Sequence, residues 1–245
     1  MRITKDIPYG SNGMHLDLYA PDQDGFDTLI WFHGGGFEAG SRRDAEPLAE
    51  SVTALGLGFA SVEYRMFPSA RFPDFLLDAA WSVAFLQKHG QDCGCGGRFV
   101  ISGQSAGAYI TMMLALNGAL LHNAGVDETS ILAYVSESSQ QTTHYNMLRQ
   151  RGIDSRAERI DEEAPLYYVG QRPLTKPLLI YNAEDIPCRP EQNLLMYQSI
   201  RHFQPDAPVF LKELPGGHCA GSTHKDENGN YPYVTALKEF LASLR

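Results

Sequence analysis

The stretch FVISGQSAGAYITMMLAL, residues 99–116, contains an apolar strand that runs directly into an apolar helix. A serine lies at the junction, with a glycine two residues away on each side, in the pattern Gly103-x-Ser105-x-Gly107. The strand and helix backbones nearly touch at such a turn, so small residues are needed at the flanking positions, and the turn lifts the serine hydroxyl above the sheet edge. G-x-S-x-G is common by chance. Its place between a β-branched strand and an uninterrupted helix predicts that Ser105 is a nucleophile.

Strand-like and helix-like segments alternate on both sides of this junction. We expect strands at residues 15–21, 28–35, 58–65, 98–105, 131–139, 177–185 and 209–217, and helices at 44–56, 75–90, 106–117, 191–203 and 233–244. This alternation predicts an α/β fold with a mostly parallel sheet of about eight strands, flanked by helices on both faces. The polar segment 140–172 departs from the pattern, and we expect a small cap insertion there rather than a second domain.

The composition suits one domain over residues 1–245, because 43% of the residues are hydrophobic and 20% are charged. The net charge of -9 argues against nucleic acid or an anionic membrane surface as a partner, since both require a basic face. No apolar run approaches the ~20 residues that span a bilayer, and residues 1–10 lack the apolar stretch of a signal peptide. We expect a cytoplasmic protein, either a monomer or a homodimer.

A second glycine-rich motif, His33-Gly34-Gly35-Gly36-Phe37, directly follows a buried strand. Acyl transfer builds negative charge on a carbonyl oxygen, and backbone N–H groups aimed at that oxygen stabilise it. Glycines allow this close approach of the main chain. We expect an oxyanion hole formed by the N–H groups of Gly35, Gly36 and Ala106. His33 is expected to brace the loop rather than to act as a base, because it precedes the nucleophile.

The acid and the base of a triad are expected after the last two strands. The segment PLLIYNAED, residues 177–185, offers Asp185, with Glu184 as the alternative. The segment LPGGHCAG offers His218 in a glycine-rich loop, and His224 is the alternative in a more polar stretch. The chain order Ser105, Asp185, His218 agrees with the order of nucleophile, acid and base known for this strand–turn–helix arrangement. Such a triad requires no metal and no organic cofactor.

With these motifs the chain resembles the esterase/lipase branch of the α/β-hydrolase superfamily that carries an HGGG oxyanion loop. This branch includes hormone-sensitive-lipase-like carboxylesterases and smaller acetyl- and feruloyl-type carbohydrate esterases. The similarity extends over LDLYAP, HGGGF, the stretch from Val62 to Leu86, GQSAGA, AEDIPCRPEQ and GGHCAG. It implies the α/β-hydrolase fold and a serine esterase that acts on a small-molecule ester. It also implies structural roles for Tyr64 and Arg65.

Two departures from the family affect the expected substrate. Gln104 stands where relatives often have Asp, Glu or His before the serine. The chain also lacks the long N-terminal helical cap of the larger lipase-like members, which suggests a more open pocket and a small or partly solvated substrate.

Several features of the sequence separate an esterase from other classes of protein. Some kynurenine formamidases share a related serine turn and a D-x-P sequence, with which Asp185-Ile186-Pro187 is compatible. Those enzymes tend to have an aromatic residue at the position of Gly36, so this glycine favours an ester substrate. A peptidase would need an added domain, and a non-catalytic small-molecule binding relative would typically have lost a member of the triad.

The stretch SESSQQTTHYN, residues 136–146, is polar for a loop at the edge where the site is expected. A pocket for a long acyl chain would need apolar lining. We therefore expect an acylated sugar as one candidate substrate; the alternative is a solvated loop that contacts nothing. The candidate substrate-binding residues are Phe37, Gln104, Glu137, Gln140, Gln141 and His144.

The four cysteines give no zinc pattern, because Cys93 and Cys95 form a C-x-C without a second pair. We expect a glycine-rich turn with two reduced thiols there. Cys188 and Cys219 closely follow the expected acid and base, and a disulfide between them is an alternative to two free thiols.

Overall fold

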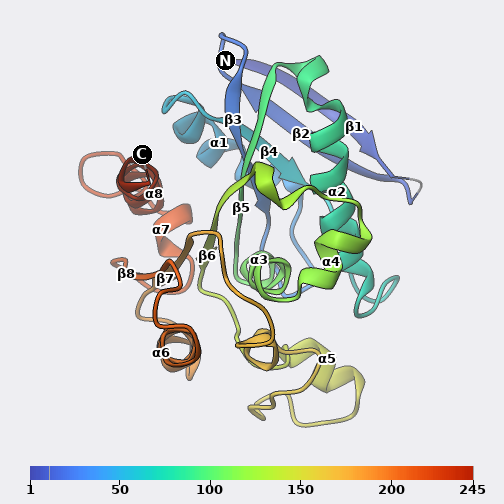
Figure 1. Cartoon of the computed structure of the whole chain (residues 1–245), viewed down its shortest axis with the longest axis vertical. Helices are drawn as coiled ribbons and strands as arrows, with labels where there is room; N and C mark the ends of the chain where they lie inside the picture. Colours follow the sequence, from blue (N-terminus) through green and yellow to red (C-terminus); the bar gives the residue numbers. More distant parts are fainter. Residues whose placement is uncertain (11, 245) are drawn as a thin grey trace.

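The computed structural model describes residues 1–10 and 12–244, and its centre is one sheet of eight strands with helices on both faces (Figure 1). The strands are β1 (Arg2–Tyr9), β2 (Met14–Ala20), β3 (Phe26–Phe32), β4 (Gly58–Val62), β5 (Cys95–Gln104), β6 (Ile131–Glu137), β7 (Leu178–Asn182) and β8 (Val209–Glu213). They lie in the order β1-β2-β4-β3-β5-β6-β7-β8. β2 pairs antiparallel with β1 and β4, and the other pairs are parallel. The predicted α/β-hydrolase fold is confirmed.

The helices cover the sheet in two layers because successive strand residues point to opposite faces. They are α1 (Glu46–Thr53), α2 (Asp74–His89), α3 (Ala106–Leu116), α4 (Gly118–Asn123), α5 (Tyr145–Gln150), α6 (Arg189–Phe203), α7 (Ala220–Thr223) and α8 (Pro232–Ser243), with short 3-10 helices η1 (Arg42–Ala45), η2 (Gly90–Cys93), η3 (Glu128–Ser130) and η4 (Pro165–Tyr168). Apolar residues of α2, α3, α4 and α6 share one core with Ile30 and Ile101 of the sheet. Those of α1 and α8 share the other core with Leu29 and Val100. Both faces of the central strands are thus buried, as expected for a parallel sheet.

Strand β1 was not predicted. Its sequence, RITKDIPY, carries charged residues and lacks a strict alternation of apolar and polar side chains. The strand lies at the edge of the sheet and pairs only with β2, so most of its residues are exposed. An edge strand of this kind is held by main-chain pairing and leaves no apolar pattern in the sequence.

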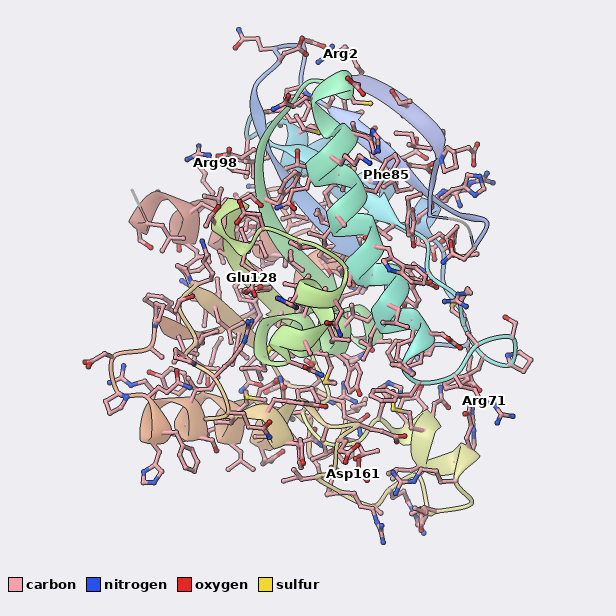
Figure 2. The ribbon with its side chains drawn as sticks, turned by 45° about the vertical axis from the view of Figure 1, so that its right-hand side comes forward. Arg2, Arg71, Phe85, Arg98, Glu128 and Asp161 are labelled. Carbon is pink, nitrogen blue, oxygen red and sulfur yellow. The ribbon has the colours of Figure 1, made fainter. Side chains whose placement is uncertain are left out.

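The segment between β6 and β7 contains only the short helices α5 and η4. It lies beyond one end of the sheet in Figure 1, and Figure 2 shows its residue Asp161 at the end of the molecule opposite Arg2. Most side chains from Ser138 to Leu148 are nevertheless buried. Within the described ranges 1–10 and 12–244, the helices are too short or too polar to cross a bilayer.

The junction between β5 and α3 is as tight as the sequence predicts. A Cβ atom on Gly103 would lie 2.5 Å from the carbonyl carbon of Gly107, and one on Gly107 would overlap the carbonyl oxygen of Phe32 in β3. Ser105 has φ 53° and ψ -115°, a sparsely populated backbone conformation. The close contact of three backbones therefore imposes this turn on the serine.

The junction predicts a large stability difference between two glycine-to-alanine variants. Gly107→Ala should lower the free energy of unfolding by at least about 3 kcal/mol, because its methyl group meets a main-chain carbonyl that cannot move aside. Gly125→Ala, at an exposed glycine with φ 77° and open space around it, should cost about 1–2 kcal/mol through backbone strain alone. Urea denaturation of both variants measures the difference. Equal losses would contradict a tight backbone contact at Gly107.

Candidate active site

The structure brings Ser105, Asp185 and His218 together from three separate loops at the carboxyl edge of the sheet. His218 Nε2 lies 2.9 Å from Ser105 Oγ, and His218 Nδ1 lies 2.5 Å from Asp185 Oδ1. The Asp185 carboxylate is buried, whereas the His218 side chain is 31% exposed and can meet a substrate from solvent. This arrangement has the geometry in which an imidazole can take a proton from a hydroxyl while a carboxylate fixes its tautomer.

The two alternatives for the acid and the base do not join this arrangement. Glu184 is exposed. His224 is exposed as well, and its Nδ1 lies 2.9 Å from the hydroxyl of its neighbour Thr223.

Asp185 is held in its charged form by its neighbours. Burial alone would raise the pKa of its carboxyl group. The hydrogen bond and the charge of His218 outweigh that effect, with help from the Ser138 hydroxyl and the Ile186 amide, and they lower the pKa below its usual value. A carboxylate that stays ionised can stabilise the imidazolium that forms during acyl transfer.

The glycine loop lies directly against the serine. A Cβ atom on Gly34 would be 3.3 Å from the Cβ of Ser105. Gly35 and Gly36 have φ angles of 106° and 64°, which favour glycine, and the Gly35 carbonyl accepts the N–H groups of Glu38 and Ala39 in a tight turn. Within the described part of the chain, the N–H groups of Gly35, Gly36 and Ala106 have no protein acceptor. They are therefore free to bind an oxyanion.

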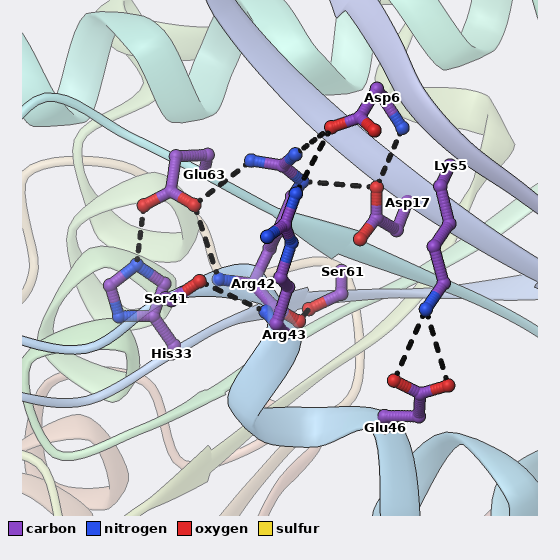
Figure 3. Close-up of polar contacts among 10 residues, drawn as sticks. All are labelled: Lys5, Asp6, Asp17, His33, Ser41, Arg42, Arg43, Glu46, Ser61 and Glu63. Carbon is purple, nitrogen blue, oxygen red and sulfur yellow. Dashed lines mark hydrogen bonds and ion pairs between the residues drawn. The ribbon is translucent and has the colours of Figure 1, made fainter.

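A charged network braces the start of this loop (Figure 3). His33 Nδ1 lies 2.7 Å from the Gly34 carbonyl oxygen, and its Nε2 lies 3.6 Å from Oε1 of Glu63. The other oxygen of Glu63 accepts hydrogen bonds from Arg42, which also pairs with the buried Asp17. The Tyr64 hydroxyl donates to the His33 carbonyl at 2.7 Å. These contacts match the bracing role expected for His33.

Helix α5 and the histidine before it also hold the glycine loop. Asn146 Nδ2 donates a short hydrogen bond to the Gly36 carbonyl oxygen, and Arg149 forms an ion pair with Glu38. The ring of His144 packs against that of Phe37, with ring centres 4.7 Å apart. The loop is therefore fixed both by the sheet side and by the insertion between β6 and β7.

Glu137, at the end of β6, links the serine turn to the histidine loop. Its main-chain carbonyl accepts the Ser105 N–H at 2.9 Å, and its Oε1 accepts the Ser222 N–H at 3.1 Å. Ser222 also donates from its hydroxyl to Gln104 Oε1 at 2.6 Å. The carboxyl group is almost fully buried, and this burial raises its pKa to about 7.

The predicted substrate contacts need correction, because most of these side chains bond to the protein itself. Phe37 is fully buried and stacks on Phe75 at 4.1 Å. Gln141 is also fully buried and donates to Asn193. Glu137, Gln140 and His144 are at most 5% exposed, and Gln104 accepts from Ser222. The polar sequence of this sheet edge predicted exposed side chains, but these side chains are mostly buried and bond to other parts of the protein.

Sequence reasoning missed Asn146, Tyr145, Arg189 and Ser222. Of these, only Arg189 lies in a stretch that carries the family resemblance, AEDIPCRPEQ. Each of the four contacts a partner 30 or more residues away, which no local pattern reveals. Arg189 alone left a signal, since it is a charged residue four positions after Asp185. Cys188 and Cys219 are free thiols, one exposed and one buried, so the disulfide alternative is not observed; Cys93 and Cys95 are free as well.

Glu137 predicts a distinctive pH dependence of stability. A carboxyl group with a pKa of about 7 in the folded protein and 4.5 ordinarily binds its proton more tightly when folded, so stability falls as pH rises between these values. Over that span the loss is about 3 kcal/mol at most. Glu137→Gln removes this titration. The free energy of unfolding of the variant minus that of wild type should therefore be larger at pH 8 than at pH 5. Denaturant unfolding at both pH values tests this, and parallel pH profiles for the two proteins would contradict it.

Comparison with known proteins agrees with the fold. A family model described as BD-FAE matches residues 16–150. The probable carboxylic ester hydrolase LipM of Mycobacterium tuberculosis is 33% identical over 119 residues, which are 45% of this chain and 28% of LipM. Human hormone-sensitive lipase is 34% identical over 93 residues, which are 37% of this chain and 9% of the lipase. The chain thus matches under a third of the length of these relatives.

Solved structures of esterases superpose on nearly the whole chain. A bacterial heroin esterase has a TM-score of 0.77 at 20% identity and covers 100% of this chain and 84% of its own. Esterase 2 of Thermogutta terrifontis has a TM-score of 0.78 at 18% identity, covering 99% of this chain and 94% of its own. At such identities the likeness establishes the fold alone. The family model matches more than half of the chain, and the chain therefore belongs to the BD-FAE family.

Proposed function

We propose that this protein is a serine hydrolase that cleaves carboxylic esters with short acyl groups, with Ser105 as nucleophile, His218 as base and Asp185 as its acid partner. The observation that carries the proposal is the continuous pair of hydrogen bonds from Ser105 through His218 to Asp185. The free N–H groups of Gly35, Gly36 and Ala106 beside the serine support it, as do the named esterases among its relatives.

In the proposed reaction, Ser105 Oγ attacks the acyl carbon while His218 Nε2 takes its proton. The resulting oxyanion binds to the N–H groups of Gly35, Gly36 and Ala106. His218 then returns the proton to the departing alcohol, which leaves an acyl group on Ser105. Water, deprotonated by His218, attacks this acyl-enzyme and releases the carboxylic acid.

We further propose that the chain forms a single catalytic domain in which residues 140–172 act as a small cap. An acylated sugar remains a candidate alcohol, but it has less support than the ester chemistry. A sugar was expected because the rim of the site looked polar in the sequence. The side chains of Gln140, Gln141 and His144 are buried, however, and do not form such a rim.

Loss of the nucleophile should abolish hydrolysis. Ser105→Ala is expected to lower kcat for 4-nitrophenyl acetate by about 10³-fold or more, leaving the residual rate due to the oxyanion hole and binding. Ser69→Ala, at an exposed serine in another loop, should keep wild-type activity. Steady-state kinetics of the three proteins tests the assignment. Equal rates for wild type and Ser105→Ala would remove Ser105 from this role.

The acyl preference should reflect the short acyl group of the proposed substrate. A long acyl chain needs apolar lining to repay its burial. We expect kcat/KM to fall from 4-nitrophenyl acetate to the butyrate and the octanoate esters. A rise along this series would point to a lipase-like acyl site instead.

A further inference from the structure

A series of contacts leads from the oxyanion loop around the site to the histidine. The Tyr145 ring packs on Gly36, so closely that a Cβ atom there would overlap its hydroxyl. The Tyr145 N–H donates to Gln140 Oε1 at 3.3 Å, and the same oxygen lies 3.5 Å from Nη2 of Arg189. Arg189 is thereby joined to the loop that would hold the oxyanion.

The series continues from Arg189 to the catalytic base. Arg189 Nη1 donates to the Ser138 carbonyl at 2.7 Å, and the Ser138 hydroxyl accepts the N–H of Cys219, the neighbour of His218, at 3.1 Å. The guanidinium group therefore lies in the wall of the site, between the end of β6 and the start of α6. Its positive charge therefore lies beside the candidate triad.

The charge of Arg189 is not matched by the protein. Two arginines are buried among the described residues, Arg42 at 9% exposure and Arg189 at 4%. Arg42 pairs with Asp6, Asp17 and Glu63, whereas no carboxylate in the described part of the chain forms an ion pair with Arg189. A buried cation without a counter-ion is costly unless a ligand supplies one.

The acidic groups nearest to Arg189 are already engaged elsewhere. Asp185 binds His218. Glu158 accepts hydrogen bonds from Thr142 and Gln192. Burial lowers the pKa of Arg189, and the more distant charges of Asp185 and Glu158 only partly oppose this. His144, the other basic group close by, is kept neutral, because burial first and then the charges of Arg189 and Arg149 lower its pKa.

The Tyr145 hydroxyl adds an unused polar group to the same wall. Within residues 1–10 and 12–244 it has no hydrogen-bond partner, although Tyr145 is partly buried and its ring lies on the oxyanion loop. A guanidinium and a phenol hydroxyl together supply donors and no negative charge. Carboxylates are the ligands that such a donor set binds best.

We propose that Arg189, assisted by the Tyr145 hydroxyl, forms a subsite for a carboxylate, and that the natural substrate is an ester that also bears a carboxylate group. This inference rests on the proposed esterase function and narrows its substrate class. It explains why a protein with a net charge of -9 buries an unpaired arginine next to its candidate triad. A guanidinium that merely ties α6 to β6 would need only the Ser138 carbonyl, and a neutral side chain could donate that bond.

Two matched pairs of substrates test the subsite, one with the carboxylate on the alcohol side and one with it on the acyl side. They are 3-acetoxybenzoate with its methyl ester, and monomethyl glutarate with dimethyl glutarate. In wild type, kcat/KM should favour the acid in at least one pair. Arg189→Gln should raise KM for that acid by about 10- to 100-fold, as expected for loss of a charge-assisted hydrogen bond, with kcat little changed.

Controls separate binding from folding and from overall charge. Arg189→Gln should lose more activity on the acid than on its neutral ester, so the ratio of the two kcat/KM values, rather than the basal rate, reports the subsite. Arg189→Lys should restore part of the preference, because it keeps the charge but not the planar fork. Arg201→Gln, at an exposed position of the same helix, makes the same change in net charge and should leave both substrates unaffected.

The other outcomes overturn the inference in distinguishable ways. No preference for the acid in either pair, with normal hydrolysis of the neutral esters, would reject the subsite and leave the esterase proposal standing. Equal losses on acid and neutral ester in Arg189→Gln would make Arg189 a structural tie. If wild type and Ser105→Ala hydrolysed both esters no faster than buffer, the proposed function itself would fail, and the subsite with it.

Discussion

The contact between the backbones of β3, β5 and the first turn of α3 is the constraint on which the site depends. Because Gly103 and Gly107 carry no side chain, the helix starts against the carbonyl of Phe32. The serine between them is forced to a positive φ and projects from the sheet edge. The same β3 strand runs on into the glycine loop, so one contact sets both the position of the nucleophile and the distance to its oxyanion donors.

The remaining parts of the site come together because the strands are parallel. Parallel strands deliver the loops that follow them to one edge of the sheet, which is why Asp185 after β7 and His218 after β8 can meet Ser105 after β5. β6 adds no member of the proposed triad, but its last residue, Glu137, ties the serine turn to the histidine loop through its carbonyl and its buried carboxyl group. The geometry of the proposed triad thus depends on a residue outside it.

How much could be predicted from the sequence depended on whether the signal was local. Glycines forced by a close backbone approach, and apolar strands buried on both faces, leave patterns within ten residues; the serine turn, the loop at Gly35 and the parallel sheet were therefore predictable. The exposed edge strand β1 leaves no such pattern. The partners of Arg189 and Asn146 lie 51 and 110 residues away, and only the folded chain brings them together.

The burial of residues 138–146 shows why a polar sequence is a poor guide to a polar surface. This stretch has little regular secondary structure, so its main-chain groups need partners that a helix or strand would have provided. Side-chain amides provide them: Gln192 accepts the N–H of Gln141, and Gln140 donates to the carbonyl of Thr143. Polar residues are thus required for an irregular segment to be buried at all. Such internal bonding does not neutralise the guanidinium of Arg189, since its hydrogen bonds to neutral oxygens satisfy its donors but not its charge.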